Sequence, residues 1–422
     1  MPNNKIFSNV LIRWSGEILS KGLWFFFLIY LARKLGVEQF GQLNYALSFS
    51  ALLIVFTDFG TNLFLVKRVA AEKNIDEKEN LLNQVLWFKV ITTIILLLIA
   101  VVLQRHNNIS GTATLIITLS FAISAFLDPL NSIYRAHKHI NIETYIMFYW
   151  RILIVVTGFI LISFHNDILY IAAALLFSAI IALIISIKVL KKKYGIAAFL
   201  FHKLNFKLWP KILFSSLWIN LVIIITTFIG RYNVLILQKF STPDQLGFYG
   251  ASYKLLEGTF FIPSLLIASI LPHFIESNVG NTLSNYGKKL FFKALYTLVF
   301  LSTLLALPLF FFSDMVIKLL YGNAYMPAAM VLKVMAVTLI FFFINELLYC
   351  VILSLNKERT VVINAFFAIV LYLPFCYIII PSHGALGAAI SLFVGHFVLC
   401  LLNFLYFIKL YFSNRLNKSN PC

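Results

Sequence analysis

Apolar segments of similar length follow one another along the whole chain, separated by short polar segments. Each apolar segment has about 20 residues, which is enough for one α-helix to cross the hydrocarbon core of a bilayer. The strands of a membrane barrel would instead show short segments of alternating hydrophobicity. The pattern therefore predicts an all-α polytopic membrane protein. The twelve predicted helices cover residues 9–32, 42–66, 84–103, 112–131, 144–164, 168–187, 212–237, 246–271, 291–312, 327–353, 361–380 and 385–408.

Composition supports the same class of protein. Hydrophobic residues make up 61% of the chain, charged residues 12%, and the mean hydropathy is +0.91. A soluble globular domain is about 45–50% apolar and about 25% charged. The loops between the predicted helices are short, the four cysteines show no metal-ligand spacing, and no G-x-x-x-x-G-K-[ST] loop occurs. We therefore expect no catalytic domain, no enzyme activity, no metal and no cofactor.

Positive residues gather in alternate loops, as the positive-inside rule describes for cytoplasmic loops. With the N-terminus in the cytoplasm, 22 of the 34 Lys and Arg residues fall in cytoplasmic segments and five on the opposite side. Twelve spans then return the C-terminus to the cytoplasm. These loops account for most of the net charge of +18, so we do not expect nucleic-acid binding.

The longest interior loop, residues 188–211, is basic and lies near the midpoint of the chain. It separates two sets of six predicted helices. We expect an N-terminal lobe over residues 1–190, a cytoplasmic linker over 191–211 and a C-terminal lobe over 212–422. A short echo indicates related halves, since EQFG (38–41) follows the first helix and DQLG (244–247) follows the seventh. Transporters built from repeats usually bind substrate between the repeats, near the bilayer midplane.

The first predicted span carries three charges on one face. Arg13, Glu17 and Lys21 are spaced i, i+4 and i+8, so they stack along one side of an α-helix. A charge at the centre of a bilayer costs at least about 2.5–3.5 kcal/mol, and such residues usually face protein or water. The stripe therefore indicates either a polar cavity or a structural group in which Glu17 neutralises the two cations.

Other predicted spans also contain charges, with cations in excess. Because phosphate oxygens accept charge-assisted hydrogen bonds from Arg and Lys, this excess favours an anionic substrate. Structural pairing is the alternative, and Lys254 and Glu257 are spaced to pair. Lys89 and Asp128 lie near the cytoplasmic ends of their spans, where we expect them to reach water and to have a structural role. The candidate substrate-binding cations are Arg13, Lys21, Arg151, Arg231, Lys254 and Lys333, and the candidate coupling or gating acids are Glu17, Asp58, Glu257 and Glu346.

Aromatic side chains are the candidates for stacking on a sugar. Most of the 43 phenylalanines and 19 tyrosines are expected in the core or against lipid. A stacking role is expected only where Trp24, Trp150 or Trp218 adjoins a charge in a cavity.

Residues 31–70 read LARKLGVEQFGQLNYALSFSALLIVFTDFGTNLFLVKRVA. The pattern A-R-x-L-G-x-x-x-F-G, followed by D-F-G and a basic end to the second helix, resembles the polysaccharide-transporter branch of the MOP (multidrug/oligosaccharidyl-lipid/polysaccharide) exporter superfamily. That branch includes the O-antigen flippases. Two later segments, LLYGNAYMPAAMVLKVMA (319–336) and HGALGAAIS (383–391), also resemble it. The matching N-terminal residues are Ala32, Arg33, Leu35, Gly36, Phe40, Gly41, Asp58, Phe59, Gly60, Arg68 and Ala70.

This resemblance implies a V-shaped protein of two six-helix lobes around a central cavity, which alternates between inward-facing and outward-facing states. The implied substrate is an undecaprenyl-pyrophosphate-linked oligosaccharide, moved from the cytoplasmic to the periplasmic leaflet of a bacterial inner membrane. A coupling ion (proton or sodium) and a polysaccharide polymerase are candidate partners.

Two other functions are compatible with the same helices. One is a cation-coupled multidrug exporter of the same superfamily, although the excess of cations argues against a cationic drug. The other is a membrane-embedded polysaccharide polymerase or ligase, although the chain lacks the large periplasmic loop common in such enzymes.

The predicted topology can be tested with reporter fusions or cysteine labelling. Fusions at Lys192 and Lys288 should report the cytoplasm, because both residues lie in the basic loops. Fusions at His106 and Gln245 should report the opposite side. Exchanged labels at either pair would contradict the twelve-span prediction.

Overall fold

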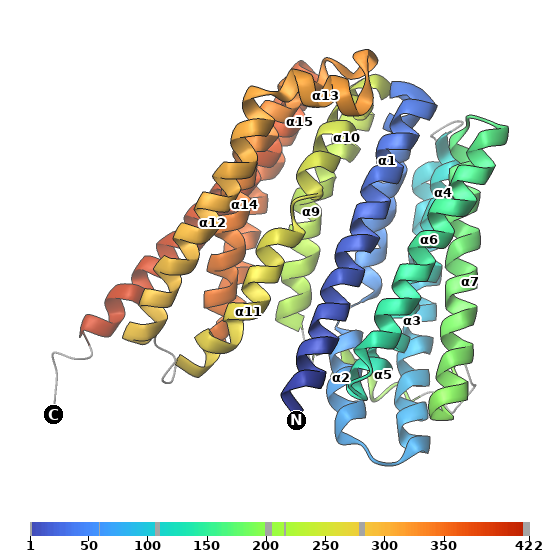
Figure 1. Cartoon of the computed structure of the whole chain (residues 1–422), viewed down its shortest axis with the longest axis vertical. Coiled ribbons are helices and arrows are strands. Elements are labelled where there is room, and N and C mark those ends of the chain that lie inside the picture. Colours follow the sequence, from blue (N-terminus) through green and yellow to red (C-terminus); the bar gives the residue numbers. More distant parts are fainter. Residues whose placement is uncertain are drawn as a thin grey trace. The chain divides into compact units, whose positions relative to one another are not determined.

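The computed structural model consists of helices joined by short turns (Figure 1). It describes residues 2–58, 60–105, 110–198, 205–214, 217–277 and 283–416, with side chains for 15–58, 60–62, 64–105, 111–198, 205–214, 217–277 and 283–411. Within these ranges every regular element is helical, which confirms the predicted all-α class.

The helices follow one another from α1 to α15, with two short 3-10 helices, η1 and η2. Their bounds are α1 Pro2–Ile54, η1 Val55–Thr57, α2 Thr61–Ala71, α3 Ile75–Gln104, α4 Ser110–Ala125, α5 Leu127–Ala136, α6 Ile140–Phe164, α7 Ile168–Tyr194, α8 Trp209–Phe214, α9 Leu217–Phe240, α10 Pro243–Glu257, α11 Phe261–Ser277, α12 Asn285–Phe311, α13 Ser313–Tyr321, η2 Asn323–Tyr325, α14 Ala328–Ser354 and α15 Glu358–Leu416.

Ten segments of the described chain are long and apolar enough to cross a membrane. Two of them contain a glycine with non-helical backbone angles, Gly36 in α1 and Gly384 in α15. These helices have 53 and 59 residues, more than twice the roughly 20 residues that one crossing needs. Each therefore provides two spans, so the described residues contain the twelve spans predicted. The expected loop after the first span is instead a kink at Gly36 within continuous helix.

Three of the predicted spans are broken rather than continuous. The span predicted over 42–66 leaves the α-helix after Ile54 and resumes at Thr61. The span predicted over 112–131 is divided into α4 and α5 at Phe126 and extends to Ala136. The span predicted over 246–271 is divided into α10 and α11 at residues 258–260.

Glycine and proline account for these breaks. Gly60, which precedes α2, has a φ of 81°, which favours glycine. Pro129 and Pro263 are each the third residue of the helix that follows a break, α5 and α11. A proline has no N–H and is tolerated in the first turn of a helix, whereas inside a continuous helix its ring clashes with the preceding turn.

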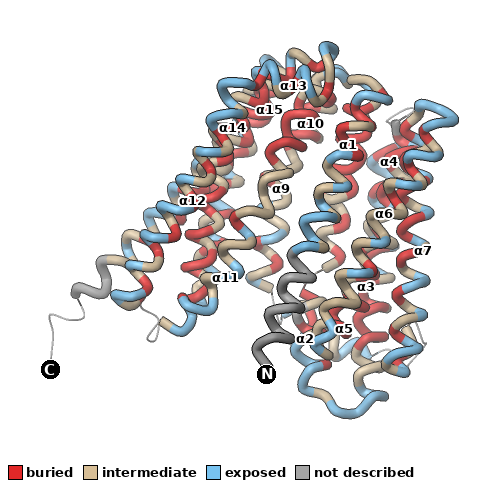
Figure 2. The backbone as a smooth tube through the Cα atoms, viewed as in Figure 1, coloured by how far each residue is buried: buried red, intermediate tan, exposed pale blue. Residues whose placement is uncertain are grey.

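Burial differs sharply between the helices, as Figure 2 shows. In α10 every residue from Tyr249 to Leu256 is buried, and the small residues Gly250, Ala251 and Ser252 allow close packing. In α12 large apolar side chains are exposed at spacings of three and four residues, which place them on one face: Tyr296, Phe300, Leu304, Leu307 and Phe311. Such an apolar exposed face suits contact with lipid.

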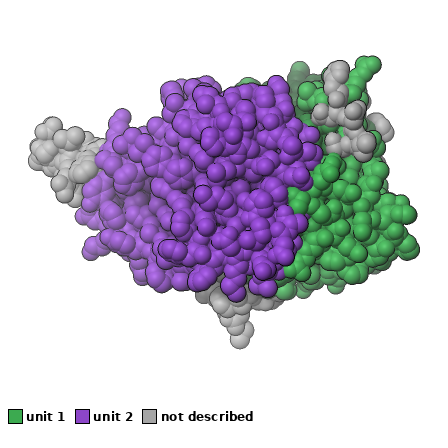
Figure 3. Space-filling model, turned by 90° about the horizontal axis from the view of Figure 1, so that it is seen from above, with its two compact units in different colours: residues 1–224 green, residues 225–422 purple. Residues whose placement is uncertain are grey.

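Packing contacts divide the chain into two compact units, residues 1–224 and 225–422, shown in two colours in Figure 3. Each unit contains its own kinked long helix; the first unit has two broken spans and the second has one. The EQFG segment lies after the kink in α1, and the DQLG segment lies in the first turns of α10. The predicted division into two lobes and a linker stays a prediction (1–190, 191–211 and 212–422). Packing contacts divide the chain into two units only, so they do not test whether residues 191–211 form a separate linker.

The kink at Gly384 is held by a contact with α10. The side-chain oxygen of Gln245 accepts a hydrogen bond from the backbone N–H of Ala385 at 2.8 Å. Gly384 has a φ of 54°, and a Cβ there would lie 2.6 Å from the same oxygen. This position therefore requires glycine for two reasons, backbone conformation and space.

We expect Gly384→Ala to lower the Tm of the purified protein more than Gly36→Ala. Both substitutions place an alanine at a positive φ, a strain of about 1–3 kcal/mol. Only the Gly384 variant also displaces Gln245, because nothing lies within 4 Å of a Cβ at Gly36. Gly22→Ala, in ordinary helix with open space, is the control and should leave the Tm unchanged or raise it. Equal losses at Gly384 and Gly36 would contradict the role of Gln245.

Candidate functional site

Three of the predicted site residues meet at one cavity of the first unit. This cavity, which we call the α1–α6 cavity, has a volume of about 240 Å³. Its charged residues are Glu17 and Lys21 from α1 and Glu143 and Arg151 from α6. The remaining lining residues are Gly16, Ser20, Thr144, Met147 and Trp150.

Helical periodicity explains why these residues share the cavity. Glu17 and Lys21 are one turn apart on α1, and Glu143, Met147, Trp150 and Arg151 follow at i, i+4, i+7 and i+8 on α6. The two helices pack closely, since a Cβ on Gly16 would lie 2.3 Å from the Thr144 side chain. The small residue at position 16 thus permits the approach of α1 to α6.

Lys21 is held loosely by its acidic neighbour Glu17. Lys21 donates to Glu17 at 2.7 Å, but the two side chains are 51% and 44% exposed. Such an exposed pair is weak, so Lys21 can exchange Glu17 for another anion. Glu143 accepts a hydrogen bond at 3.1 Å from Arg135, which does not line the cavity. Together with Arg135, the group carries one net positive charge.

Arg151 stacks between two indole rings. Its guanidinium carbon lies 5.1 Å from the ring centroid of Trp24 and 5.4 Å from that of Trp150. Stacking uses the faces of the guanidinium, whereas its N–H donors point outward in its plane. Trp24 and Trp150 therefore orient the Arg151 guanidinium by stacking on its faces. Two of the three tryptophans proposed for stacking adjoin a cavity charge, and Trp218, which is 40% exposed on α9, lines neither cavity described here.

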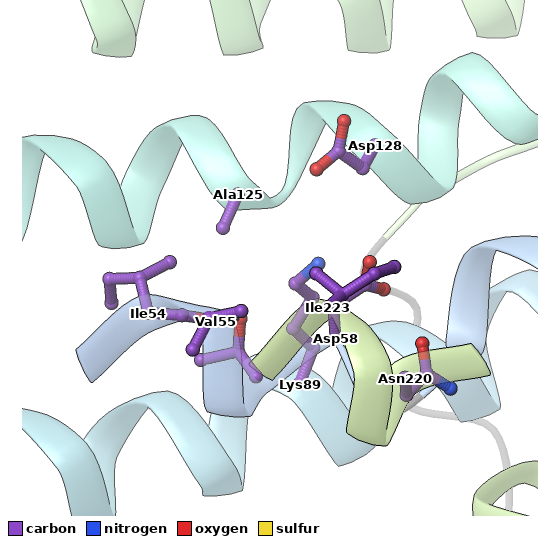
Figure 4. Close-up of a pocket in the computed structure, with 9 residues that line it drawn as sticks. Ile54, Val55, Asp58, Lys89, Ala125, Asp128, Asn220 and Ile223 are labelled. Carbon is purple, nitrogen blue, oxygen red and sulfur yellow. Dashed lines mark hydrogen bonds between the residues drawn. The ribbon is translucent and has the colours of Figure 1, made fainter. Parts of the chain in front are cut away.

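A second cavity in the first unit, which we call the Asp58 cavity, has a volume of about 170 Å³ (Figure 4). It lies at the breaks of two spans, between η1 with Asp58 and the junction of α4 with α5. Its charged residues are Asp58, Lys89 and Asp128. The other lining residues are Ile54, Val55, Thr57, Ala125, Asn220 and Ile223.

The expectation that Lys89 reaches water is wrong. Its side chain has no exposed surface, and its Nζ atom is buried without a hydrogen-bond partner among the described residues. Packing of α3 against α2, α4 and α5 encloses this position, so the end of the span does not open to solvent there. Lys89 faces the Asp58 cavity instead.

The second unit gathers Arg231, Lys254 and Glu257. Glu257 accepts hydrogen bonds from Arg231 and, at 2.6 Å, from Lys254 Nζ. Both cations also lie over the Tyr253 ring, at 5.1 and 5.9 Å from its centroid. The expected i, i+3 pairing of Lys254 with Glu257 is present, and it forms directly before the break between α10 and α11. The group keeps one net positive charge.

The remaining predicted residues lie apart from these groups. Lys333 on α14 is 3.7 Å from Asp314 on α13, and both are partly exposed. Glu346 forms no hydrogen bond or ion pair with any described side chain. Arg13 lies on α1, and its side chain is outside the described residues. Within the described ranges no group of three or more His, Cys, Asp or Glu could hold a metal ion.

Three cavity residues were missed or misjudged from sequence. Glu143 was not singled out, although it lies two turns before Arg151 on the same face of α6. Asn220 was not singled out, because a single polar residue at the start of an apolar span is common. The sequence places Lys89 near the end of its span, but it does not show that neighbouring helices cover that position.

Comparison with known proteins gives a family match. A model of the family described as "Polysaccharide biosynthesis protein" matches residues 6–278. A Shigella flexneri protein named as a candidate O-antigen transporter is 24% identical over 384 residues, covering 86% of this chain and 88% of that protein. The capsular polysaccharide biosynthesis protein CapF of Staphylococcus aureus is 23% identical over 404 residues, covering 93% and 96%.

Solved structures with the same fold include transporters of different substrates. An inward-facing multidrug resistance transporter of the MATE family, within the MOP superfamily, has a TM-score of 0.74 at 14% identity and covers 97% of this chain and 99% of its own. The lipid II flippase MurJ in an inward closed conformation has a TM-score of 0.73 at 16% identity, covering 96% and 90%. At these identities the likeness shows the fold.

The group around Glu257 gives a stability prediction. We expect Glu257→Gln to destabilise the protein by about 3 kcal/mol or more, because it leaves Arg231 and the buried Lys254 without their common counter-ion. Glu17→Gln is the matched control and should have little effect, since its pair with Lys21 is exposed. The measurement is the Tm in detergent for each variant. Similar Tm values for the two variants would contradict the structural role of Glu257.

Proposed function

Because the chain belongs to the polysaccharide biosynthesis protein family, we propose that it is a flippase for a lipid-linked oligosaccharide. The substrate is an oligosaccharide, such as an O-antigen-like repeat unit, joined through a diphosphate to undecaprenol. It is moved by alternating access from the cytoplasmic to the periplasmic leaflet of a bacterial inner membrane. Both termini of the chain lie in the cytoplasm.

The observation that carries this proposal is the α1–α6 cavity. Lys21 and Arg151 present cationic donors, and Trp24 and Trp150 present flat aromatic faces next to them. A diphosphate accepts charge-assisted hydrogen bonds from such donors. The apolar faces of sugar rings suit contact with indole. The cavity thus offers cations for the diphosphate and aromatic faces for the first sugar, which is attached to that diphosphate in the substrate.

Relatives support the same substrate class. The Shigella protein is named for O-antigen and the Staphylococcus protein for capsular polysaccharide. A Haloferax volcanii relative named as a probable low-salt glycan biosynthesis flippase is 22% identical over 391 residues, covering 89% of this chain and 78% of that protein. All three names refer to a glycan, and two of them refer to its transport.

The physical problem of the reaction explains why a cavity is needed. A diphosphate and several hydroxyl-rich sugars cannot cross hydrocarbon unaided, because each buried polar group without a partner costs several kcal/mol. The polyprenyl chain has no such cost and can stay in lipid. The protein therefore has to supply a polar path for the headgroup alone.

In our proposal the cations of both units bind the headgroup. Arg13, Lys21 and Arg151 in the first unit, and Arg231 and Lys254 in the second, bind the headgroup during transit, with Lys333 further along the path. Glu17 and Glu257 occupy the cations when substrate is absent and so limit the entry of other anions. Asp58 and Glu346 are the remaining candidate acids for gating or coupling. A coupling ion and a polysaccharide polymerase are the proposed partners.

The proposal is tested with the full-length protein in liposomes. A fluorescent undecaprenyl-diphosphate oligosaccharide is placed in both leaflets, and the glycan in the outer leaflet is removed with an added glycosidase. With the protein present, the inner-leaflet glycan should become accessible within the experiment, whereas protein-free liposomes should protect about half of it. Equal protection in both preparations would contradict the flippase function.

Substitutions in the α1–α6 cavity should reduce this transport without loss of protein. We expect Arg151→Ala and Lys21→Ala to lower the rate at least about tenfold, since each removes a charged hydrogen bond worth about 1.5–3 kcal/mol. Arg13→Ala and Arg231→Ala should also reduce the rate. Arg151→Lys should retain more activity than Arg151→Ala, because the charge remains although the planar donors are lost.

A neutral double variant separates binding from pairing. If Lys21 served only to neutralise Glu17, then Glu17→Gln with Lys21→Gln would transport at the wild-type rate. The proposal predicts that this double variant stays impaired, because the cation itself contacts the substrate. Full transport by the double variant at normal protein levels would remove Lys21 from the proposed site.

A further inference from the structure

We propose that the Asp58 cavity is a proton-binding site in which Asp128 takes up the proton. The cavity lies apart from the α1–α6 cavity and shares none of its lining residues. If the chain is the flippase proposed above, this proton is its coupling ion, and that part of the proposal rests on that function. The proton binding itself does not depend on the substrate.

The position of the cavity favours a site that can change conformation. It is lined from η1, α3, the α4–α5 junction and the start of α9, and two of these places are breaks in membrane spans (Figure 4). Broken spans bring polar side chains into the membrane and are the usual location of ion sites in transporters. A change of charge here acts directly on the joints of two spans.

The two carboxylates of the cavity are held differently. Asp58 accepts hydrogen bonds from the Thr61 hydroxyl at 2.8 Å and from the Asn62 amide at 2.9 Å. Both of its carboxylate oxygens are thus already held by hydrogen-bond donors. The Asp128 carboxylate has no hydrogen bond or ion pair with any described side chain. Among the described side chains Asp128 is therefore the cavity carboxylate that no donor holds, and we assign the proton to it.

Lys89 supplies the second, independent observation. Its ammonium group is fully buried, lines the same cavity and has no hydrogen-bond partner among the described residues. A buried ammonium needs nearby negative charge or water. Asp58 and Asp128 lie around the cavity from two other elements and provide that negative charge (Figure 4).

The sum of charges indicates which ion the cavity accepts. Two carboxylates and one ammonium give a formal charge of −1, and one added cation makes the group neutral. A sodium ion needs several oxygen ligands and would be repelled by Lys89. A proton needs only the Asp128 oxygen and adds no volume. The proton that binds comes from water, and on release it returns to water.

Other charges near Asp128 do not alter this balance. Arg135 and Glu143, from α5 and α6, pair with each other at 3.1 Å. Lys67 and Arg68 on α2, Lys188 on α7 and Lys138 before α6 are exposed or face the surface. Lys78 on α3 contacts His137 at 3.3 Å. The charge state of the cavity is thus set by Asp58, Lys89 and Asp128.

Protonation changes the forces at the two breaks. With both carboxylates charged, Lys89 on α3 attracts η1 and α5 at once. With Asp128 neutral, the attraction to α5 is lost while that to Asp58 remains. Proton binding therefore releases α5 from α3, and in a transporter such a change can accompany the reorientation of helices.

The test uses the full-length protein in lipid nanodiscs without any glycan. Infrared difference spectra between acidic and alkaline buffers detect the carbonyl stretch of protonated carboxyl groups. Subtracting the Asp128→Asn spectra from those of the wild type should leave one band, which belongs to Asp128. In a Lys89→Met background this band should persist to a higher pH, by about one unit or more, because a nearby positive charge no longer opposes protonation.

Asp244→Asn is the matched control, since Asp244 is an exposed aspartate in the first turn of α10. The band isolated by this substitution should not respond to Lys89→Met. If Asp128→Asn does not fold, Asp128→Glu serves instead and should shift the frequency of the same band. A wild-type spectrum without an Asp128 band, or a band that does not respond to Lys89→Met, would overturn the proposal. A midpoint that changes when Na⁺ replaces K⁺ would also overturn it, because it would indicate a sodium site.

The coupling role is measured separately in the liposome assay. An imposed pH gradient should speed glycan transport by the wild type and have no effect on Asp128→Asn. If the wild type transports glycan and ignores the gradient, the coupling role is wrong and the flippase function stands. If no glycan is transported while the infrared band is present, the flippase function is wrong and the proton site stands.

Discussion

Charge inside a bilayer costs at least about 2.5 kcal/mol for each side chain, and the described structure meets this cost in three different ways. Arg231 and Lys254 both pair with the Glu257 carboxylate, and both lie over the ring of Tyr253. Lys21 and Glu17 pair with much of their surface exposed beside a cavity. Lys89 has no direct partner and lies in a cavity with two carboxylates. These differences determine how readily each cation can exchange its present partner for a ligand.

The breaks in the spans follow from the same constraint. Two of them, at Asp58 and after Glu257, lie beside a charged group, and the third, at Phe126, lies two residues before Asp128. A continuous apolar helix offers no free polar atoms, whereas a break exposes backbone groups and changes the direction of side chains. Pro129 and Pro263 favour the new helix that begins after two of the breaks. Polar residues and helix ends thus occur together in both units.

The number and class of the spans could be predicted from sequence because hydropathy alone determines them. The break at Phe126 could not, because hydropathy averaged over a span reads through Asp128 and Pro129 near its end. The shared cavity of Lys21 and Arg151 follows from tertiary packing of α1 on α6, which the period of either helix does not specify. The burial of Lys89 was missed for the same reason, since a position near the end of a span is exposed only if no neighbouring helix covers it.

The proposed function depends on recognition of a diphosphate by Lys21 and Arg151, and binding to lipids of graded charge measures this directly. Native mass spectrometry of the purified full-length protein compares undecaprenyl diphosphate, undecaprenyl monophosphate and undecaprenol. The strongest binding is expected for the diphosphate, weaker binding for the monophosphate and the weakest for the alcohol, with the difference between the two phosphates reduced in Arg151→Ala. Equal binding of all three lipids, or an Arg151→Ala variant with unchanged preference, would contradict it.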